Sequence, residues 1–350
     1  MSTKAHCHLI VDLDIGGTEN SLLKTLPLIQ SPENHHIVIN LSRPGPIGDK
    51  LRQHDIQVHD LNLLHPIKFL PGVTRLYRLL NEVHPESLTT YFIYSDLLGR
   101  LVGRLAGIDR IYCFQRGALL AAEPLRVLDF LTKFLVTKYL FVSDALRERV
   151  SSQLHLPRRQ TQTIPNGIVP PPSRRHQTHS APTITHVGSF KPRKGQEFLL
   201  QSLKDLRDID YHLQFIGSGP LLRSCKALCH SLGLDQRVTF VGQVTEVAQY
   251  YQQTDIFVLT SLEEGMSNAL LEAMSHACAV IAHHSPENRE VVGHTGILVD
   301  VTNTSAFAAK LRYLITHPQL RRRLGHQARL RVQHYFHLDR TIKSLQALYS

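Results

Sequence analysis

Residues 255–283 read DIFVLTSLEEGMSNALLEAMSHACAVIAH, and this stretch decides the fold class. The apolar run at 255–260 predicts a buried strand. Ser267 or Asn268 is a good N-cap for a helix that continues to residue 277. A second apolar run, at 278–283, predicts another strand. Strand, helix and strand in this order are typical of a parallel α/β sheet.

The same alternation covers the whole chain of 350 residues. In the first half we expect strands at 8–14, 36–40, 56–59, 87–92, 110–114 and 138–142, and helices at 19–30, 47–54, 71–83, 96–106, 123–136 and 144–153. In the second half we expect strands at 183–187, 211–216, 237–241, 255–260, 278–283 and 297–300. Its helices are expected at 195–206, 220–232, 245–253, 267–277, 287–292, 304–316, 318–334 and 338–349. The alternation predicts two Rossmann-like β/α/β domains that face each other across a cleft, with ligands at the carboxyl ends of the strands.

A polar, proline-rich segment separates the two halves. It reads TIPNGIVPPPSRRHQTHSAP at 163–182, and three consecutive prolines cannot continue a helix or a central strand. The predicted domains are therefore 1–165 and 183–334, joined by a linker at 166–182.

The composition is that of an ordinary globular protein, with 42% apolar and 19% charged residues. The N-terminus lacks the layout of a signal peptide, and no window reaches the ~20 uncharged apolar residues of a spanning helix. We therefore expect a cytoplasmic protein. The five scattered cysteines are expected to be buried free thiols, and the 22 histidines show no metal-ligand spacing. Because tryptophan is absent and other aromatic residues are few, nucleic-acid binding is not expected.

The net charge of +10 is concentrated near the C-terminus. Only Asp339 opposes the cations of this region, which are Lys310, Arg312, Arg321, Arg322, Arg323, Arg329, Arg331, Arg340 and Lys343. A basic helical face could meet phosphate or an anionic membrane. A solvated helix face explains the pattern equally well.

The loop GSFKPRKG at 188–195 carries three cations directly before a helix start. A helix N-terminus already has about half a positive charge. Cations are therefore unfavourable there unless an anion also binds, and such local conflicts tend to mark functional sites.

The loop before the helix at 267–277 carries acids on both sides. Glu264 precedes the helix cap, while Asn268 and Glu272 share one helix face. Backbone N–H groups of residues 265–268 are expected to bind a phosphate, and the Glu272 carboxylate could accept both hydroxyls of a ribose. Glu272 could also be an ordinary helix-surface acid. The glycine-containing stretches 14–19 and 215–220 are explained equally well as tight turns.

Six motifs, in the same order as in the family, resemble glycosyltransferase family four, a group of retaining enzymes with the GT-B fold. They are G-G-x-E at 16–19, I-P-N-G at 164–167, V-G-x5-K-G at 187–195, G-x-G-P-L at 217–221, F-x-G at 240–242 and E-x7-E at 264–272. The match covers almost the whole chain.

The resemblance implies a nucleotide-sugar donor, UDP- or GDP-linked, in the C-terminal domain. It implies catalytic roles for Glu264, facing the sugar, and for Lys194, at the diphosphate. The donor-binding residues that it implies are Gly17, Gly188, Arg193, Lys194, Gly265, Met266, Ser267, Asn268, Leu271 and Glu272. The first domain would bind the acceptor and would be joined by the last helix, at about 335–350.

The chain departs from the family pattern at two places. Ser189 stands where many members have arginine. The segment YFIYSDLLGR at 91–100 lacks a histidine that many members have, so the acceptor-side residues Tyr94, Asp96 and Arg116 are predicted by position alone. A helix cap explains Asp96 better than a role at the acceptor.

No metal or other cofactor is expected. The D-x-D patterns at 12–14 and 208–210 lie away from the proposed donor loops, and Lys194 with the helix dipole can stabilise a leaving diphosphate without an ion.

The leading hypothesis is a retaining glycosyltransferase that transfers a sugar to a glycan or lipid-linked acceptor, in cell-surface polysaccharide or lipopolysaccharide biosynthesis. The basic C-terminal helices would rest on the inner membrane face. The alternatives are a GT-B nucleotide-sugar epimerase or phosphorylase and a catalytically silent nucleotide-sugar-binding protein.

Overall fold

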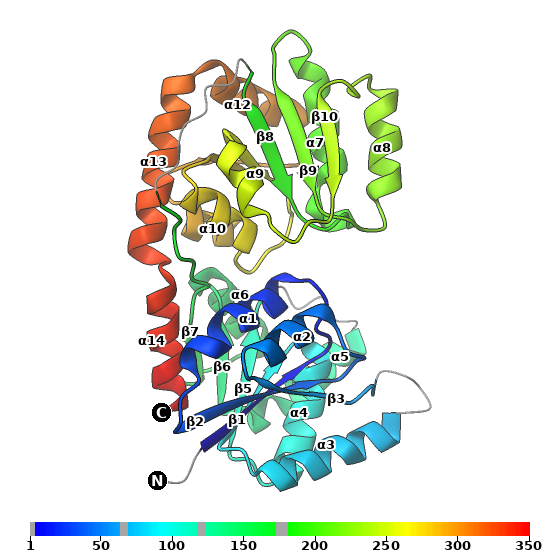
Figure 1. Cartoon of the computed structure of the whole chain (residues 1–350), viewed down its shortest axis with the longest axis vertical. Helices are drawn as coiled ribbons and strands as arrows, with labels where there is room; N and C mark the ends of the chain where they lie inside the picture. Colours follow the sequence, from blue (N-terminus) through cyan, green and yellow to red (C-terminus); the bar gives the residue numbers. More distant parts are fainter. Residues whose placement is uncertain (1–3, 64–68, 118–122, 173–180) are drawn as a thin grey trace. The chain divides into compact units, whose positions relative to one another are not determined.

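The computed structural model describes residues 4–63, 69–117, 123–172 and 181–350. The chain forms two compact units (Figure 1). The N-terminal unit contains residues 1–166 and 339–350, and the C-terminal unit contains residues 167–338. Residues 173–180 of the predicted linker lie outside the described residues.

The N-terminal unit is built on a seven-stranded parallel sheet in the order β3-β2-β1-β4-β5-β6-β7. Its strands are β1 (Lys4–Ile10), β2 (Asn34–Asn40), β3 (Gln57–Asp60), β4 (Ser87–Tyr91), β5 (Arg110–Gln115), β6 (Lys138–Phe141) and β7 (Thr161–Thr163). Its helices are α1 (Gly17–Ile29), α2 (Pro46–Gln53), α3 (Phe69–Val83), α4 (Ile93–Leu105), α5 (Glu123–Thr132), α6 (Asp144–Leu154) and α14 (Leu338–Tyr349), with short 3₁₀ turns η2 (Lys133–Leu135) and η3 (Arg158–Gln160).

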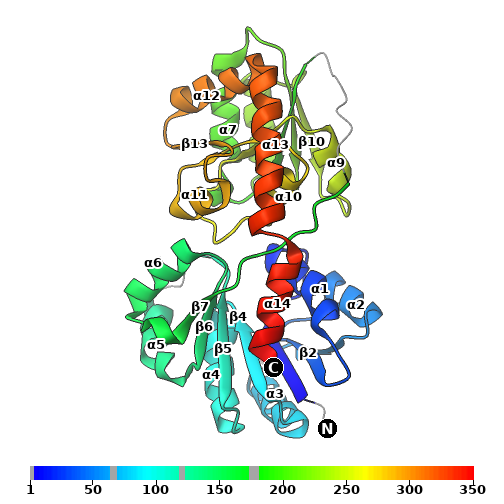
Figure 2. The same ribbon diagram turned by 90° about the vertical axis from the view of Figure 1, so that its left-hand side faces the viewer.

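The two faces of this sheet differ in chemistry. Alternate residues of a strand point to opposite faces. In β1, Cys7 and Leu9 join the apolar core that includes residues of α3 and α4. His6 and His8 instead contact the Tyr349 ring of α14, with ring centroids 4.9 and 5.6 Å away. Figure 2 shows α14, in red, against this sheet.

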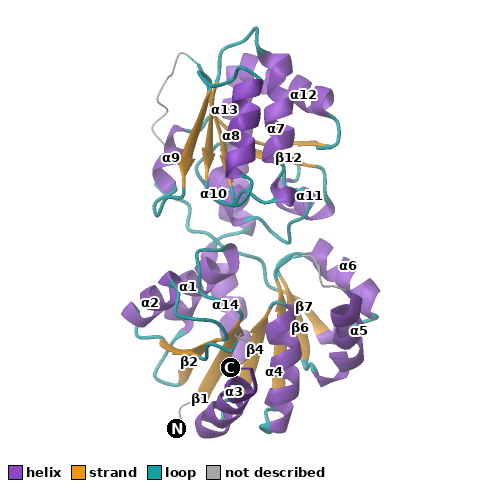
Figure 3. Ribbon diagram, turned by 90° about the vertical axis from the view of Figure 1, so that its right-hand side faces the viewer, coloured by secondary structure: helices purple, strands orange, loops and turns teal. Residues whose placement is uncertain are grey.

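The C-terminal unit is built on a six-stranded parallel sheet in the order β10-β9-β8-β11-β12-β13. Its strands are β8 (Thr183–Val187), β9 (His212–Ile216), β10 (Val238–Gly242), β11 (Ile256–Leu259), β12 (Ala279–His283) and β13 (Ile297–Val299). Its helices are α7 (Gln196–Leu203), α8 (Leu222–Ser231), α9 (Ala248–Gln253), α10 (Asn268–Ser275), α11 (Pro286–Val292), α12 (Thr304–Thr316) and α13 (Pro318–Tyr335), with 3₁₀ turns η4 (Pro192–Lys194) and η5 (Lys204–Leu206). In each unit helices flank the strands (Figure 3).

The core of the C-terminal unit reaches the loop that follows β8. The ring of Phe190, in that loop, packs 5.8 Å from the ring of Phe215 on β9, and Phe215 stacks on Phe240 of β10 at 5.3 Å. Phe190 and Phe215 are fully buried. Burying an aromatic side chain contributes about 2–3 kcal/mol, so Phe190 fixes the loop to the sheet.

The expected α/β alternation is confirmed, with local differences from the predicted bounds. The strand predicted at 8–14 is β1, which ends at Ile10. β7 forms although its sequence, TQT, has no apolar signal, because it pairs with β6 at the sheet edge. The helix predicted at 123–136 consists of α5 and the 3₁₀ turn η2. The helix predicted from residue 195 starts at Gln196, since Gly195 adopts a left-handed conformation with φ of 72°.

Candidate functional site

Two loops that the sequence singled out lie at the same edge of the C-terminal sheet. The loop 188–195 follows β8, and the loop 260–267 follows β11. β8 and β11 are paired and parallel, so their carboxyl ends are neighbours. Ligands of open parallel sheets bind at such an edge.

The two loops are joined by a pair of salt bridges. Lys194 Nζ lies 2.5 Å from Glu264 Oε1, and these side chains are 29% and 16% exposed. Arg193 Nη1 lies 2.7 Å from Glu263 Oε2, closer to the surface. Two groups that the sequence proposed for one site, Lys194 and Glu264, are therefore brought together from positions 70 residues apart.

Hydrogen bonds to backbone carbonyls hold the two loops in register. The Thr260 hydroxyl donates to the Lys194 carbonyl at 2.8 Å, and the Leu262 N–H donates to the Arg193 carbonyl at 3.0 Å. A Cβ at Gly195 would lie 2.4 Å from the Thr260 carbonyl oxygen. Residue 195 must therefore be glycine, both for its left-handed φ and for this close approach.

The G-x-G turn at 217–219 packs against the cationic loop. A Cβ at Gly217 would lie 2.2 Å from the Gly188 carbonyl oxygen, and one at Gly219 would lie 2.6 Å from the Phe190 carbonyl oxygen. Both glycines have positive φ. These motif glycines therefore shape the loop that carries Lys194.

Helix α10 begins where the sequence predicted. Ser267 is its N-cap and its hydroxyl accepts from the Leu270 N–H at 3.3 Å. Met266 and Leu271, both predicted donor-binding residues, are buried, with Leu271 only 1% exposed. Asn268 and Glu272 lie on the partly exposed face. Burial and the Glu272 carboxylate both raise the pKa of Tyr251 well above its usual value.

Two polar residues at the same sheet edge were not predicted from the sequence. His186 is buried at the end of β8, its Nε2 lies 3.3 Å from the Lys194 carbonyl oxygen, and burial lowers its pKa to about 4. It is therefore neutral at pH 7. The Ser261 hydroxyl is buried and has no hydrogen-bond partner among the residues that the structure describes. The only sequence signal for either residue was its position at the end of an apolar strand.

In the N-terminal unit, Arg116 after β5 and Glu19 in the first turn of α1 are close enough for their charges to interact. Arg116 follows β5, donates to Asn166 Oδ1 and has its guanidinium 5.1 Å from the centre of the Phe114 ring. Burial raises the pKa of Glu19 to about 7, Asp12 adds to this rise, and Arg116 opposes it. From the sequence, Glu19 was noted only as the last residue of the G-G-x-E motif, and no role was predicted for it. Gly17, which the resemblance implied as a donor-binding residue, is the first residue of α1.

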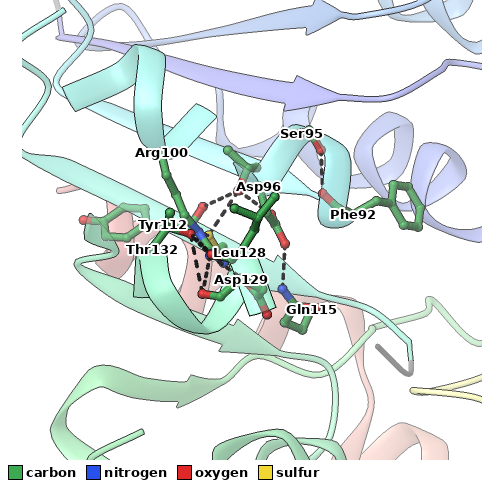
Figure 4. A network of polar contacts seen from close by, with 11 residues as sticks. Phe92, Ser95, Asp96, Arg100, Tyr112, Gln115, Leu128, Asp129 and Thr132 are labelled. Atoms are coloured by element: carbon green, nitrogen blue, oxygen red, sulfur yellow. Dashed lines mark hydrogen bonds and ion pairs between the residues drawn. The ribbon is translucent and has the colours of Figure 1, made fainter. Parts of the chain in front are cut away.

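Tyr94 and Asp96 occupy opposite environments on α4. Tyr94 is 57% exposed, whereas Asp96 is fully buried. Asp96 Oδ1 accepts from the Thr90 hydroxyl at 2.5 Å, and its Oδ2 accepts from the Gln115 amide at 2.8 Å (Figure 4). Burial raises the pKa of this carboxyl to about 6. Asp96 thus supports the strand ends from inside the unit and presents no surface to a ligand.

Within the described ranges, no group of three or more histidine, cysteine, aspartate or glutamate side chains could hold a metal ion. Asp208 of the second D-x-D pattern forms a salt bridge with Arg312 at 2.6 Å. All five cysteines are buried thiols that take part in no disulfide. None of the described helices is both long and apolar enough to cross a bilayer.

Comparison with known families identifies the domain that carries the two loops. Residues 181–317, which include both loops, match the family described as glycosyl transferases group 1. These residues form a glycosyltransferase domain, and the chain is a glycosyltransferase.

Curated relatives of this glycosyltransferase carry related names. A capsular polysaccharide biosynthesis glycosyltransferase, CapH, of Staphylococcus aureus is 24% identical over 81% of this chain and 82% of its own length. A GDP-mannose-dependent alpha-(1-6)-phosphatidylinositol monomannoside mannosyltransferase of Mycobacterium tuberculosis is 29% identical over 66% of this chain and 68% of its own. Others match over about half their length, such as an N-acetyl-alpha-D-glucosaminyl L-malate synthase of Bacillus anthracis, covered over 46%.

Solved structures confirm the predicted GT-B fold class of the glycosyltransferase. Anabaena Alr3699/HepE, whose structure in complex with UDP-glucose is known, superposes with a TM-score of 0.85 at 17% identity, over 98% of each chain. A sucrose-phosphate synthase of Thermosynechococcus elongatus superposes with a TM-score of 0.83 at 19% identity, over 99% of this chain and 98% of the other. At these identities the likeness concerns the fold alone.

Much of the C-terminal charge of the glycosyltransferase is used internally. Arg312 binds Asp208, and Arg321 donates to the carbonyls of Leu314 and Ile315. Arg329 and Arg331 also donate to backbone carbonyls. These four arginines brace helices within the C-terminal unit, so fewer guanidinium groups are open to a partner than the cationic run in the sequence suggests.

Proposed function

We propose that this enzyme transfers a sugar, with retention of configuration, from a UDP- or GDP-linked donor to a glycan or lipid-linked acceptor in cell-surface polysaccharide or lipopolysaccharide biosynthesis. The observation that carries the proposal is the salt bridge between Lys194 and Glu264, which joins the two predicted donor loops beside the N-terminus of α10. A cation and a helix N-terminus together favour a diphosphate.

The donor groups divide into two roles. When the bond between the sugar and the diphosphate breaks, its electron pair goes to a phosphate oxygen. Lys194 and the α10 dipole stabilise that negative charge in place. Glu272, one turn further along α10, accepts the ribose hydroxyls, while Asn268, Ser267 and Gly265 line the approach to the diphosphate.

The sugar lies against Glu264 in this proposal. Lys194 orients the Glu264 carboxylate through their salt bridge, and Arg193 does the same for Glu263. The acceptor hydroxyl attacks the sugar carbon from the face that the diphosphate leaves, and its proton passes to the phosphate oxygen that received the electron pair. Gly188 belongs to the same donor loop as Lys194. The buried Ser261 hydroxyl is a further hydrogen-bonding group at this edge of the sheet.

The relatives support a nucleotide-sugar donor of either base. The structures of HepE include complexes with UDP and with UDP-glucose, and the mycobacterial relative is named as GDP-mannose-dependent. The capsular relative and a Rhizobium meliloti lipopolysaccharide core biosynthesis glycosyltransferase support a cell-surface acceptor.

On the acceptor side we propose Arg116, Tyr94 and Glu19 as contacts, with Gly17 approaching the donor. The charge of Arg116 acts on Glu19, and Tyr94 is exposed on the first turn of α4. Asp96 acts as a positioning residue, because its carboxylate fixes Thr90 and Gln115 beneath this surface.

Calorimetric titration with UDP and with GDP tests the donor site. We expect Lys194→Ala and Glu272→Ala each to weaken binding of the preferred nucleotide about tenfold or more, as expected for losing a charge-assisted hydrogen bond. Lys191→Ala is the matched control, since Lys191 is an exposed cation of the same loop. Unchanged binding by both site variants would show that the donor lies elsewhere.

Measuring the release of free nucleotide distinguishes sugar transfer from binding of the donor alone. With cell-extract glycolipids supplied as acceptors, the enzyme should release free nucleotide from the donor sugar, and the released amount should rise with acceptor. The Glu264→Gln variant should retain nucleotide binding and lose this release. Donor binding without any release would favour a silent nucleotide-sugar-binding protein.

We also propose that the basic C-terminal helices bind an anionic membrane surface. It rests on Lys310, Arg322, Arg323, Arg340 and Lys343, the five cations of this region other than the four arginines that brace the C-terminal unit. Each Lys or Arg near an anionic surface is worth about 1 kcal/mol, so these five would suffice for salt-sensitive binding.

A further inference from the structure

One position on the core face of β8 carries a histidine. Residues two apart in a strand share a face, so His186 lies on the same face as Ile184, which belongs to the apolar core. In the parallel register His186 lies opposite Phe215 of β9, and the two ring centres are 5.5 Å apart. The His186 side chain is almost fully buried. A polar ring in such apolar surroundings costs free energy unless it forms a hydrogen bond.

His186 forms its hydrogen bond with the loop that carries Lys194. Its Nε2 lies 3.3 Å from the Lys194 carbonyl oxygen. Because a carbonyl oxygen only accepts, this contact assigns the proton of the neutral ring to Nε2, which donates. Burial lowers the pKa of His186 to about 4, so the ring carries no charge at pH 7. His186 therefore acts on the loop through a donated hydrogen bond and not through charge.

The Lys194 carbonyl oxygen is held from two neighbouring strands. It accepts from His186, on β8, and from the hydroxyl of Thr260, which directly follows β11, at 2.8 Å. A carbonyl oxygen has two lone pairs, so both are used. The next residue, Gly195, has a left-handed φ of 72°. The peptide unit after Lys194 is therefore fixed at its oxygen by two donors, and the direction in which the Lys194 side chain leaves the backbone is fixed with it.

The ammonium group of Lys194 lies at the other end of this arrangement. Lys194 Nζ contacts Glu264 Oε1 at 2.5 Å, and the Lys194 side chain remains 29% exposed, so a ligand can reach it. A lysine side chain is flexible, and holding its backbone reduces the conformations that compete with the one that meets Glu264. An apolar residue at position 186 would also fill the core, but it would leave the Lys194 carbonyl with Thr260 as its donor.

We propose that His186 is a positioning residue for the nucleotide-sugar donor: by holding the Lys194 carbonyl, it keeps the Lys194 ammonium where the donor diphosphate binds. His186 does not touch the donor, since its ring is buried. The inference rests on the donor site proposed above, in which Lys194 binds the diphosphate.

Substitutions at residue 186 test the hydrogen bond. The amide nitrogen of glutamine can take the place of Nε2, whereas that of asparagine reaches only the place of Nδ1. Binding of UDP and of GDP is measured by calorimetry. For the preferred nucleotide we expect His186→Gln to bind within about twofold of the wild type, and His186→Asn to bind about threefold to tenfold more weakly, the range for losing one hydrogen bond.

Two further variants separate this effect from a general loss of stability. Leucine suits the apolar surroundings, so His186→Leu should keep the wild-type melting temperature and still lose nucleotide affinity as His186→Asn does. His212→Asn is the matched control, because His212 begins β9 at the opposite edge of the same sheet, where its Nε2 contacts the Thr239 hydroxyl. This control should bind the nucleotide as the wild type does.

A double-mutant cycle shows whether the effect passes through the Lys194 side chain. In the Lys194→Ala background the carbonyl is still present, but the ammonium group is absent. His186→Asn and His186→Leu should therefore cause no further loss of nucleotide binding there. A merely structural role of His186 would weaken binding by the same factor in both backgrounds.

Three results would overturn the proposal. The first is wild-type nucleotide affinity in His186→Leu. The second is a His186→Gln variant that binds as weakly as His186→Asn, which would assign the effect to packing. The third is an equal loss in the two backgrounds of the cycle. A failure of the donor site itself looks different, because Lys194→Ala would then bind the nucleotide as tightly as the wild type, and both proposals would fall.

Discussion

At the scale of single residues, the donor edge depends on glycine as much as on charge. Gly195 follows Lys194, has φ of 72° and lies against the Thr260 carbonyl. An alanine there meets two separate costs, a left-handed backbone and a steric clash with a buried strand end. Because Lys194 is the next residue along the chain, the distortion would move its ammonium away from Glu264.

We predict that Gly195→Ala lowers the free energy of unfolding by about 2 kcal/mol or more, measured by urea denaturation. Gly233→Ala is the matched control, because Gly233 has φ of 65° and no atom lies within 4 Å of an added Cβ. The control should lose about 1 kcal/mol, from backbone strain alone. Equal losses in the two variants would show that the contact with Thr260 carries no cost.

At the scale of elements, the N-terminal unit uses buried charge where most folds use apolar packing. Arg100 joins α4 to α5 through Asp129, and its guanidinium also lies 5.4 Å from the centre of the Tyr139 ring. Breaking such a pair is costly because the remaining charge stays buried. Replacing both partners with apolar residues removes that problem.

We predict that Asp129→Ala costs about 3–5 kcal/mol, and that the double variant Arg100→Met with Asp129→Leu recovers most of this loss. Glu123→Ala is the control on the same helix. Glu123 forms an exposed pair with Arg126, so its removal should change the free energy of unfolding by less than about 1 kcal/mol. A double variant as unstable as Asp129→Ala would contradict the stranded-charge explanation.

At the scale of the whole molecule, the last helix returns to the first unit and covers a histidine-lined sheet face. Tyr349 of α14 lies 4.9, 5.6 and 5.0 Å from the ring centres of His6, His8 and His36. Burial lowers the pKa of all three histidines, that of His36 to about 3. Each is therefore neutral in the folded protein at pH 7.

This arrangement predicts that acid destabilises the N-terminal unit. Below pH 6.5 the histidines of the unfolded chain take up protons that the folded cluster does not bind, so stability falls as the pH drops toward 3. At 1.36 kcal/mol per pKa unit, the shift of His36 alone corresponds to roughly 5 kcal/mol.

Hydrogen exchange of α14 as a function of pH measures this effect. We expect protection of residues 338–349 to decline below pH 6.5 in the wild type, and the decline to be smaller in His36→Leu, which has lost one titrating group. His35→Leu is the matched control, since His35 is exposed on the same strand. Identical pH profiles for wild type and His36→Leu would contradict the prediction.

The sequence by itself determined the order of the elements and the chemistry of the donor loops. Alternating apolar periodicity, helix caps and turn glycines are local signals, so strands such as β8 and β11, the N-cap Ser267 and the conflict of cations at 191–194 could all be recognised. Nearly every predicted element forms within a few residues of its expected bounds. β7 could not be recognised, because its three polar residues become a strand only by pairing with β6.

Only the tertiary structure decided which groups meet. The pairing of Lys194 with Glu264 joins residues 70 positions apart, and it exists because β8 and β11 are neighbours in the sheet. Burial and exposure are likewise properties of the folded chain. Asp96 is buried, four C-terminal arginines bind groups within their own unit, and the apolar side chains of α5 are exposed. A periodic pattern shows that a helix has an apolar side, but which side faces the core depends on what packs against it. For α5 it is the buried Arg100, paired with Asp129, that turns the polar side inward.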